Sequence, residues 1–277
     1  MARTAKINKR MLFIGGGNIA GAVACGLVSS GTISSEFVSV YDIDSSKFQK
    51  FTNLGISVYT DLGSAAVNAE LIFLAVKPNI VSSVMRSLAE IEGLLDRVTI
   101  VSFAAAVSID HIIKSAGRNV AVIRTMPSTP ILVGEGVLAV AHNELVSPEL
   151  FQYFCRTMSS IAYVSIIPEE QMNPIISVHG SSPAYVYLFV KSMIDAAEQQ
   201  GIDPKIALPL ILKTIKGSVT MIEKSDETIE QLIKNVASPN GTTLAALESF
   251  EKDDFSGSVL RAMDACTKRA NEISIEL

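Results

Sequence analysis

Three small residues with the spacing Gly15-x-Gly17-x-x-Ala20 follow the apolar run Met11–Ile14 and could hold a phosphate group. In such a turn Gly15 permits a tight bend, Gly17 lets a phosphate approach the backbone, and Ala20 lets the following helix lie close to the strand. Free N–H groups at the N-terminus of that helix would face the anion. A tight turn that binds nothing can have the same glycines, so the motif alone leaves that alternative open.

A carboxylate, Asp42, follows the second predicted strand, Phe37–Tyr41. An acidic side chain at this distance from the glycine motif can bind the hydroxyl groups of a ribose. The strand before the glycines, the helix after them and this acidic residue together favour a dinucleotide site over an empty turn.

A second polar cluster precedes a predicted helix at Ser238-Pro239-Asn240-Gly241-Thr242-Thr243. This turn delivers hydroxyl and free N–H groups to a helix start, which suits a substrate carboxylate. Ser-Pro and Asn-Gly are also common turn pairs, and Thr242 or Thr243 could simply cap the helix, so both interpretations stay open. A further small polar turn, His179–Tyr185, enters another long helix at Pro183.

Strands and helices alternate from Met11 to about Ser165, which predicts a mostly parallel sheet with helices on both faces. The predicted strands are Met11–Ile14, Phe37–Tyr41, Ile56–Val58, Leu71–Val76, Val98–Phe103, Val120–Met126, Val137–Ala141 and Ala162–Ser165. Good helix-start signals lie between them at Asp44, Ser64, Asn79, Ser108 and Ser147-Pro148. The predicted fold class is α/β, with an N-terminal Rossmann-type doubly wound sheet.

Small residues and fixed turns follow three successive strands of this sheet. In a doubly wound sheet, ligands lie beyond the carboxyl ends of the strands. The three strand ends are Ala75-Val76-Lys77-Pro78, Ser102-Phe103-Ala104-Ala105-Ala106 and Met126-Pro127-Ser128-Thr129-Pro130. They suit a flat cofactor ring that lies against backbone, although proline after a strand is also ordinary loop chemistry.

After Pro168 the strand patterns end and helical periodicity begins. We predict a dinucleotide-binding domain at residues 1–166 and an all-α domain for dimerisation and substrate binding at residues 167–277. Its apolar positions exceed what one small core can use, which predicts a homodimer or larger homo-oligomer. The predicted helices are Gln171–Val178, Pro183–Gln200, Lys205–Lys224, Thr228–Asn235, Thr242–Phe250 and Phe255–Leu277.

The chain of 277 residues has a net charge of −5, and its lysines and arginines are scattered. We therefore expect a small-molecule partner and no nucleic acid.

The chain has three cysteines whose spacing suits neither metal binding nor redox chemistry: Cys25, Cys155 and Cys266. This predicts buried free thiols in a reducing compartment and no metal site. The apolar run after the basic segment Arg3–Arg10 is too short for a signal sequence, and no run reaches transmembrane length. We expect a cytoplasmic location and no membrane partner.

Five motifs, in order and over nearly the full length of the chain, resemble those of the pyrroline-5-carboxylate reductase family. They are Phe13-Ile-Gly-Gly-Gly-Asn-Ile-Ala20, Ala75-Val-Lys-Pro78, Arg124-Thr-Met-Pro-Ser-Thr-Pro130, Gly180-Ser-Ser-Pro-Ala-Tyr185 and Ser238-Pro-Asn-Gly-Thr-Thr243. The resemblance implies the last step of proline biosynthesis. In that step a hydride passes from NAD(P)H to the imine carbon of 1-pyrroline-5-carboxylate, which yields L-proline.

The resemblance also implies roles for individual residues. Thr243 matches the hydroxyl that meets the imine nitrogen, and because the protonated imine is already an electrophile, the protein mainly aligns two rings. The implied pyrophosphate-binding residues are Gly15, Gly17, Asn18, Ile19 and Ala20. The implied border of the cofactor is Ala75, Val76, Lys77, Pro78, Phe103, Ala104 and Ala105. The implied substrate-binding residues are Ser238, Asn240, Gly241, Thr242 and Thr243.

The chain departs from the family pattern at a few positions. Ala106 and Asn240 stand where glycine is usual, His179 where serine is usual, and Ser128 where asparagine is usual. The usual His-Pro pair ahead of the last motif is missing near Glu227. These departures leave room for an altered substrate preference.

Two alternatives stay open at this point. One is a related reductase that acts on another imine or on a hydroxyacid. A hydroxyacid reductase would need a catalytic lysine, and Lys191 is the candidate near a substrate turn. An inactive homologue would bind the nucleotide without turnover.

Cofactor choice depends on the charge near the ribose. Asp42 and Asp44 would repel the 2′-phosphate of NADPH, and no arginine follows closely to bind it. On charge alone we predict that NADH is used at least as well as NADPH.

Overall fold

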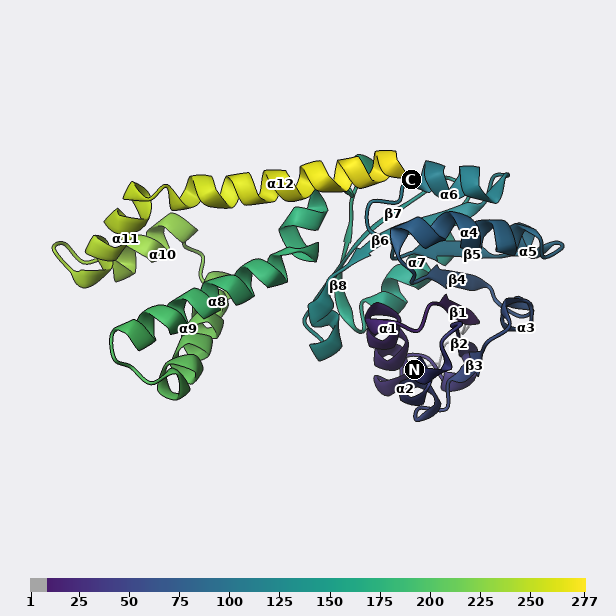
Figure 1. Cartoon of the computed structure of the whole chain (residues 1–277), viewed down its shortest axis with the longest axis horizontal. Coiled ribbons are helices and arrows are strands. Elements are labelled where there is room, and N and C mark those ends of the chain that lie inside the picture. The colour runs from purple at the N-terminus through teal and green to yellow at the C-terminus, as the bar shows by residue number, and fades with distance from the viewer. Residues whose placement is uncertain (1–8) are drawn as a thin grey trace. The chain divides into compact units, whose positions relative to one another are not determined.

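The computed structural model describes residues 9–277 and contains one eight-stranded sheet (Figure 1). The strand order is β3-β2-β1-β4-β5-β6-β7-β8, and neighbouring strands are parallel except for β6 and β7. All eight predicted strands are confirmed, with ends that differ by at most two residues. Arg3 and Lys6 of the basic segment lie outside the described residues. The strands are β1 (Met11–Ile14), β2 (Val38–Tyr41), β3 (Ser57–Tyr59), β4 (Leu71–Leu74), β5 (Thr99–Ser102), β6 (Ala121–Pro127), β7 (Gly136–His142) and β8 (Ala162–Ile166).

The helices between these strands lie on both faces of the sheet. They are α1 (Asn18–Ser29), η1 (Ser35–Phe37), η2 (Ser45–Lys47), α2 (Gln49–Thr52), α3 (Leu62–Ala66), α4 (Pro78–Ala89), α5 (Leu94–Arg97), α6 (Ile109–Ala116), η3 (Thr129–Val133) and α7 (Pro148–Met158).

The central strand β1 explains why both faces need helices. Met11 and Phe13 point into one hydrophobic cluster with side chains of α1 and α7, whereas Leu12 and Ile14 point into another with α4 and α6. All four side chains are at most 1% exposed. Because successive side chains of a strand point to opposite faces, an entirely apolar strand is stable only when both faces are covered.

Side-chain caps begin several helices where the sequence predicts them. Asp44, Ser108 and Ser147 each accept a backbone hydrogen bond at the start of η2, α6 and α7, respectively. Ser64 lies in the first turn of α3, which begins two residues before it. Asp61 is the N-cap residue of α3 and accepts a hydrogen bond from the Ser64 N–H at 2.7 Å.

The rest of the chain is helical, as predicted, but one predicted helix is wrong. Instead of a helix at Gln171–Val178 there are a short 3-10 turn and a single π-helical turn. Pro174 lies between them, and proline cannot donate the backbone hydrogen bond that a continuous helix needs. The elements of this part are η4 (Glu169–Gln171), η5 (Ile176–Gly180), α8 (Ser182–Gln199), α9 (Pro204–Lys224), α10 (Ile229–Val236), α11 (Thr242–Lys252) and α12 (Phe255–Glu276).

Backbone contacts divide the chain into two compact units. One comprises Met1–Ser181, of which residues 9–181 are described, together with Cys266–Leu277, and the other is Ser182–Ala265. The end of the last strand at Ile166 agrees with the predicted end of the strand pattern. The compact first unit nevertheless includes η4, η5 and the last three turns of α12, which the sequence analysis assigned to the second domain.

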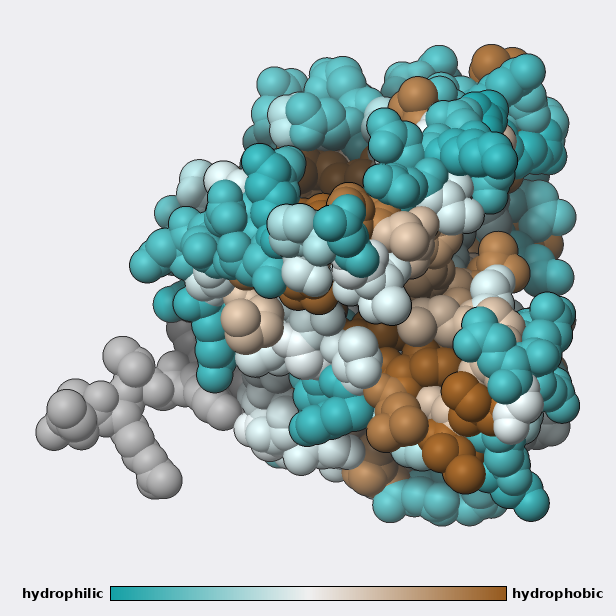
Figure 2. All heavy atoms as spheres, turned by 90° about the vertical axis from the view of Figure 1, so that its left-hand side faces the viewer, coloured by the Kyte–Doolittle hydropathy of each residue, from teal (hydrophilic) through white to brown (hydrophobic). Residues whose placement is uncertain are grey.

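The helical unit Ser182–Ala265 has little core of its own. Within it, Ala207 and Ile211 are the buried hydrophobic side chains, whereas Leu188, Leu210 and Leu260 are each more than 60% exposed. Figure 2 shows the face that lies on the left-hand side of Figure 1. Hydrophobic residues, drawn in brown, are exposed on this face. Such a surface indicates contact with another protein chain.

None of the helices within residues 9–277 is both long and apolar enough to span a membrane.

Candidate active site

The predicted glycine turn joins β1 to α1, and its first glycine is required by the packing. Gly15 has a φ of +100°, and a Cβ there would lie 2.5 Å from the carbonyl oxygen of Ala75. Only glycine adopts this backbone conformation at such a close approach without strain. The turn is therefore held directly against the loop that follows β4.

The second glycine leaves space where a ligand could approach. A Cβ on Gly17 would meet no atom within 4 Å. The N–H groups in the first turn of a helix have no partner within the helix. Gly17 is the N-cap residue of α1 and has no side chain that could accept a hydrogen bond from them. These N–H groups, which belong to Asn18, Ile19 and Ala20, form an anion-binding helix start of the predicted kind.

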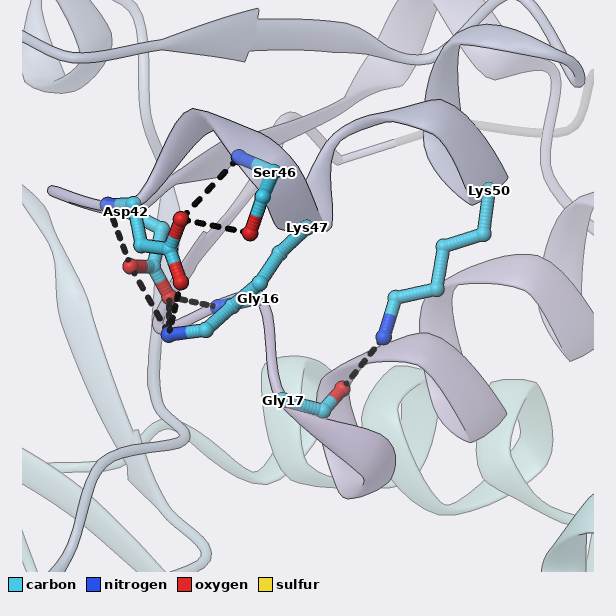
Figure 3. A network of polar contacts seen from close by, with 7 residues as sticks. Gly16, Gly17, Asp42, Ser46, Lys47 and Lys50 are labelled. Carbon is cyan, nitrogen blue, oxygen red and sulfur yellow. Dashed lines mark hydrogen bonds and ion pairs between the residues drawn. The ribbon is translucent and has the colours of Figure 1, made fainter.

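Asp42, directly after β2, holds this turn in place (Figure 3). Its Oδ2 atom accepts a hydrogen bond from the Gly16 N–H at 2.7 Å, and its Oδ1 atom accepts one from the Asp44 N–H at 2.9 Å. The Lys47 ammonium lies 3.0 Å from both carboxylate oxygens. Burial raises the pKa of Asp42, but the two N–H bonds and Lys47 together lower the pKa more, so the net shift is downward. Asp42 is an ionised anchor whose acceptor sites are largely used within the protein.

The sequence analysis missed two lysines beside the turn. Lys47 ends η2 and pairs with Asp42, and Lys50 in α2 donates a hydrogen bond to the carbonyl oxygen of Gly17 at 3.0 Å (Figure 3). Both ammonium groups therefore lie close to the turn that would bind phosphate. The relevant signal in the sequence is a lysine, five residues after Asp42, rather than an arginine.

The predicted cofactor border after β4 lies at the same edge of the sheet as the glycine turn. Ala75 donates its N–H to the carbonyl oxygen of Ile14 at 2.9 Å. Val76 is partly exposed, Lys77 is the N-cap residue of α4, and Pro78 is its first residue, one position before the predicted start. Because β1 and β4 are parallel neighbours, their carboxyl ends lie side by side.

The predicted border after β5 is made of residues with different surroundings. The Phe103 ring is 7% exposed and packs 5.5 Å from the ring of Phe73, centroid to centroid, so the ring belongs to the core. Ala104 is buried and Ala105 is partly exposed. The Phe103 backbone is thus the part of that residue that could line a cofactor.

Two departures from the family pattern occur at positions with left-handed backbone. Ala106 has a φ of +63° and Asn240 has a φ of +57°. Glycine, the usual residue at both positions, adopts this conformation without strain, asparagine tolerates it, and alanine is strained there. The turns therefore keep the backbone shape that glycine permits.

The second predicted site lies where α10 leads into α11. Gly241 is the N-cap residue of α11, and neither Thr242 nor Thr243 caps the helix with its side chain. A Cβ on Gly241 would collide with the Ser238 hydroxyl. Two threonine residues and the uncapped N–H groups of an 11-residue helix therefore occur at one helix start, which fits a carboxylate.

His179 lies in the π-helical turn η5 and contacts the end of β6. Its Nε2 atom lies 2.9 Å from the carbonyl oxygen of Met126, and its Nδ1 atom lies 3.1 Å from that of Ile175. Burial lowers the pKa of His179. A neutral imidazole donates one N–H, so one of these carbonyls accepts it at neutral pH.

Lys191, the residue that a hydroxyacid dehydrogenase would need, lies on α8. It is well exposed and pairs with Asp195 at 2.6 Å, one helical turn away. This is an ordinary surface pair.

The three cysteines are free, as predicted, but partly rather than fully buried. Within residues 9–277, no group of side chains is suited to hold a metal ion.

The predicted site residues fall in both compact units. All the cofactor-binding residues belong to the unit that contains the sheet, and Ser238–Thr243 belongs to the helical unit.

Two family models match this chain. A family model described as NADP oxidoreductase, coenzyme F420-dependent, matches residues 10–106, and one described as pyrroline-5-carboxylate reductase dimerisation matches residues 169–273. The second match supports self-association of the chain. A solved structure of prephenate dehydrogenase from A. aeolicus, 13% identical with a TM-score of 0.55, shares the fold alone.

Full-length relatives give the family. The Escherichia coli pyrroline-5-carboxylate reductase is 33% identical over 97% of this chain and 99% of its own length. The enzyme of Corynebacterium melassecola is 32% identical over 94% of this chain and 97% of its own length. The crystal structure of Plasmodium falciparum pyrroline carboxylate reductase with NADP bound has a TM-score of 0.88 and 30% identity, covering 96% of this chain and 98% of that one. The chain therefore belongs to the pyrroline-5-carboxylate reductase family.

Proposed function

We propose that this protein reduces 1-pyrroline-5-carboxylate to L-proline with a hydride from NAD(P)H. The observation that carries the proposal is the uncapped start of α1 behind the glycine turn, in a chain of this family. The open space beside Gly17 fits a pyrophosphate, because a side chain there would fill the approach to the N–H groups.

When bound, the cofactor supplies the hydride for the carbon of the C=N bond. The chain's own residues then hold the substrate and its proton. The N–H groups of Thr242 and Thr243 bind the substrate carboxylate at the start of α11. The Thr243 hydroxyl accepts a hydrogen bond from the protonated ring nitrogen and so favours the iminium form over the neutral imine. After hydride addition that nitrogen keeps its proton as the amine, so no strong general acid is required.

The charges beside the glycine turn bear on the choice of cofactor. Asp42, Asp44 and Lys47 form a cluster with two negative charges and one positive charge, so this cluster is negative, whereas Lys50 donates to the Gly17 carbonyl oxygen. A 2′-phosphate is disfavoured by a net negative charge. We therefore propose that NADH is used at least as well as NADPH. The F420-type family match and the NADP-bound relative support a nicotinamide cofactor without distinguishing the two.

The exposed apolar side chains of Ser182–Ala265 are proposed to pack against a second copy of the chain, giving a homodimer or a larger homo-oligomer. We further propose that the reaction takes place in the cytoplasm, a compartment that supplies NAD(P)H.

The test is oxidation of NADH and of NADPH, measured side by side with 1-pyrroline-5-carboxylate, by the wild type and Thr243→Ala. Loss of one hydrogen bond to a charged group predicts that kcat/KM falls by about tenfold or more. Thr220→Ala is the matched control, because the Thr220 hydroxyl bonds a carbonyl of its own helix. Turnover of a hydroxyacid but not of the imine, or cofactor binding without any turnover, would refute the proposal.

A further inference from the structure

The loop after β5 ends in a strained residue that is held by the last turns of α12. Ala106 is 2% exposed and has a φ of +63°. Its carbonyl oxygen accepts a hydrogen bond from the Ser274 hydroxyl at 2.5 Å. An alanine in left-handed conformation needs support from its surroundings to persist. The Ser274 hydroxyl provides such support at the strained residue itself.

Ser274 is the third member of an oriented chain of hydrogen bonds. An Arg124 Nη atom donates to the Asn173 Oδ1 atom at 2.6 Å, and the Asn173 Nδ2 atom donates to the Ser274 hydroxyl oxygen at 3.0 Å. A guanidinium only donates, so it fixes which end of the Asn173 amide faces it. The Ser274 oxygen is then an acceptor, and its proton is directed to the Ala106 carbonyl oxygen at 2.5 Å, which is nearer than the Ala270 carbonyl oxygen at 3.2 Å. Bonds arranged in this way polarise one another, starting here from a charged group.

The same buried arginine also holds the other end of the loop. Arg124 is 4% exposed and pairs with Glu169 at 3.3 Å. Glu169 in turn accepts a hydrogen bond from the Ile109 N–H at 2.7 Å, at the first residue of α6. Ala106 and Ile109, on the two sides of the turn between β5 and α6, are therefore both tied to Arg124.

We propose that Ser274 is a positioning residue for the cofactor. It holds the loop Phe103–Ala106 in the shape that places its backbone against the cofactor. This inference rests on the proposed function, in which that loop borders the nicotinamide nucleotide. The need for Ser274 arises from the side chain of Ala106, since glycine would adopt the same φ without support.

The experiment measures the Kd of NADH by fluorescence titration for the wild type, Ser274→Ala, Ser274→Thr, Ala106→Gly and the double variant Ser274→Ala/Ala106→Gly. Ser274→Ala should raise the Kd about fivefold, the equivalent of one hydrogen bond. Ser274→Thr keeps the hydroxyl and should restore the wild-type Kd. In the Ala106→Gly background, removal of the hydroxyl should change the Kd by less than about twofold.

Ser159→Ala is the matched control, because the Ser159 hydroxyl donates to a carbonyl of its own helix in the same unit. Its Kd should equal that of the wild type, which would show that loss of a hydroxyl–carbonyl bond elsewhere in the unit does not by itself weaken NADH binding. An unchanged Kd in Ser274→Ala, or an equal loss in the Ala106→Gly background, would overturn the inference.

The titration contains no imine substrate, so its result is independent of turnover. If NADH binding depends on Ser274 but the wild type does not reduce 1-pyrroline-5-carboxylate, the proposed reaction fails and the positioning role stands. The titration is repeated with NADPH, and failure of the wild type to bind either nucleotide overturns both.

Discussion

Asp42 and Lys47 form an ion pair in which the ammonium lies 3.0 Å from both carboxylate oxygens. The Asp42 side chain is 7% exposed and that of Lys47 is 40% exposed, so the cation is the member of the pair that faces solvent. A ligand at this edge would meet an acidic residue whose charge is largely neutralised. Lys47 is therefore the side chain through which cofactor selectivity can be changed.

Replacing this lysine should reduce the use of NADPH selectively. In Lys47→Met the charge of Asp42 is no longer compensated, and the 2′-phosphate of NADPH meets it directly. We expect kcat/KM for NADPH to fall about fivefold relative to that for NADH, the effect of one partly exposed charge pair. Parallel kinetics with both cofactors measure the ratio. Lys114→Met, at an exposed pair with Asp110, is the control and should leave the ratio unchanged.

The lowered pKa of Asp42 predicts a pH-dependent contribution to stability. Burial acts to raise this pKa, but the bonds to Gly16, Asp44 and Lys47 lower it more. A group with a lowered pKa stabilises the fold above its unfolded value of about 3.9, and this stabilisation is lost as the pH falls through its folded value. Asp42→Asn should therefore lower the Tm at neutral pH.

The difference in Tm between the wild type and Asp42→Asn should shrink as the pH falls below about 4. Thermal unfolding across this pH range measures the difference. Asp110→Asn, at an exposed surface pair, provides the comparison and should change the Tm little at neutral pH. A difference that stays constant with pH would contradict ionisation of Asp42 as its cause.

His179 should make the protein less stable in mild acid. Burial lowers its pKa, so the unfolded chain binds a proton below about pH 6.5 that the folded protein takes up less readily. Stability should fall as the pH decreases from this value until the folded pKa is reached. In His179→Gln, the loss of Tm between about pH 7 and pH 5 should be smaller than in the wild type.

The control for this prediction is Ser159→Ala, which removes no ionisable group. The Ser159 hydroxyl donates to a carbonyl of its own helix, so its replacement should leave the pH dependence of the Tm unchanged. Equal slopes in the wild type and His179→Gln would show that His179 does not titrate differently in the two states.

The apolar surface of the helical unit should be essential for self-association. A charge at Leu210, which is 62% exposed in one chain, would be buried without a partner in the dimer. We expect Leu210→Glu to shift the protein toward the monomer in light scattering and to lower the Tm by about 5 °C or more. Leu145→Glu is the matched control, because Leu145 is also half exposed but lies in the other unit. A dimer that withstands Leu210→Glu would place the interface elsewhere.

Local patterns in the sequence predict most of the secondary structure. The eight strands and the helices α8 to α12 lie within two residues of their predicted bounds. The error at Gln171–Val178 also has a local cause, since Pro174 interrupts the helical period. Strand and helix periods depend on neighbouring residues, so they can be read without knowledge of the fold.

The candidate site was predicted in part for the same reason. The glycine turn and the start of α11 depend on short motifs, and both occur where the sequence places them. The left-handed backbone at Ala106 was not evident, because alanine gives no local signal of it. The resemblance to a family with glycine at that position was the available clue.

The sequence by itself determined the strands, most of the helix starts and the glycine turn between β1 and α1, since these depend on residues only a few positions apart. The tertiary structure decided that Asp42 anchors Gly16, which lies 26 positions away in the chain. It also decided that Ser274 supports Ala106, although the two are 168 positions apart in the chain. Such contacts form only when distant segments pack together, because the hydrogen-bonding capacity of a side chain does not specify its partner.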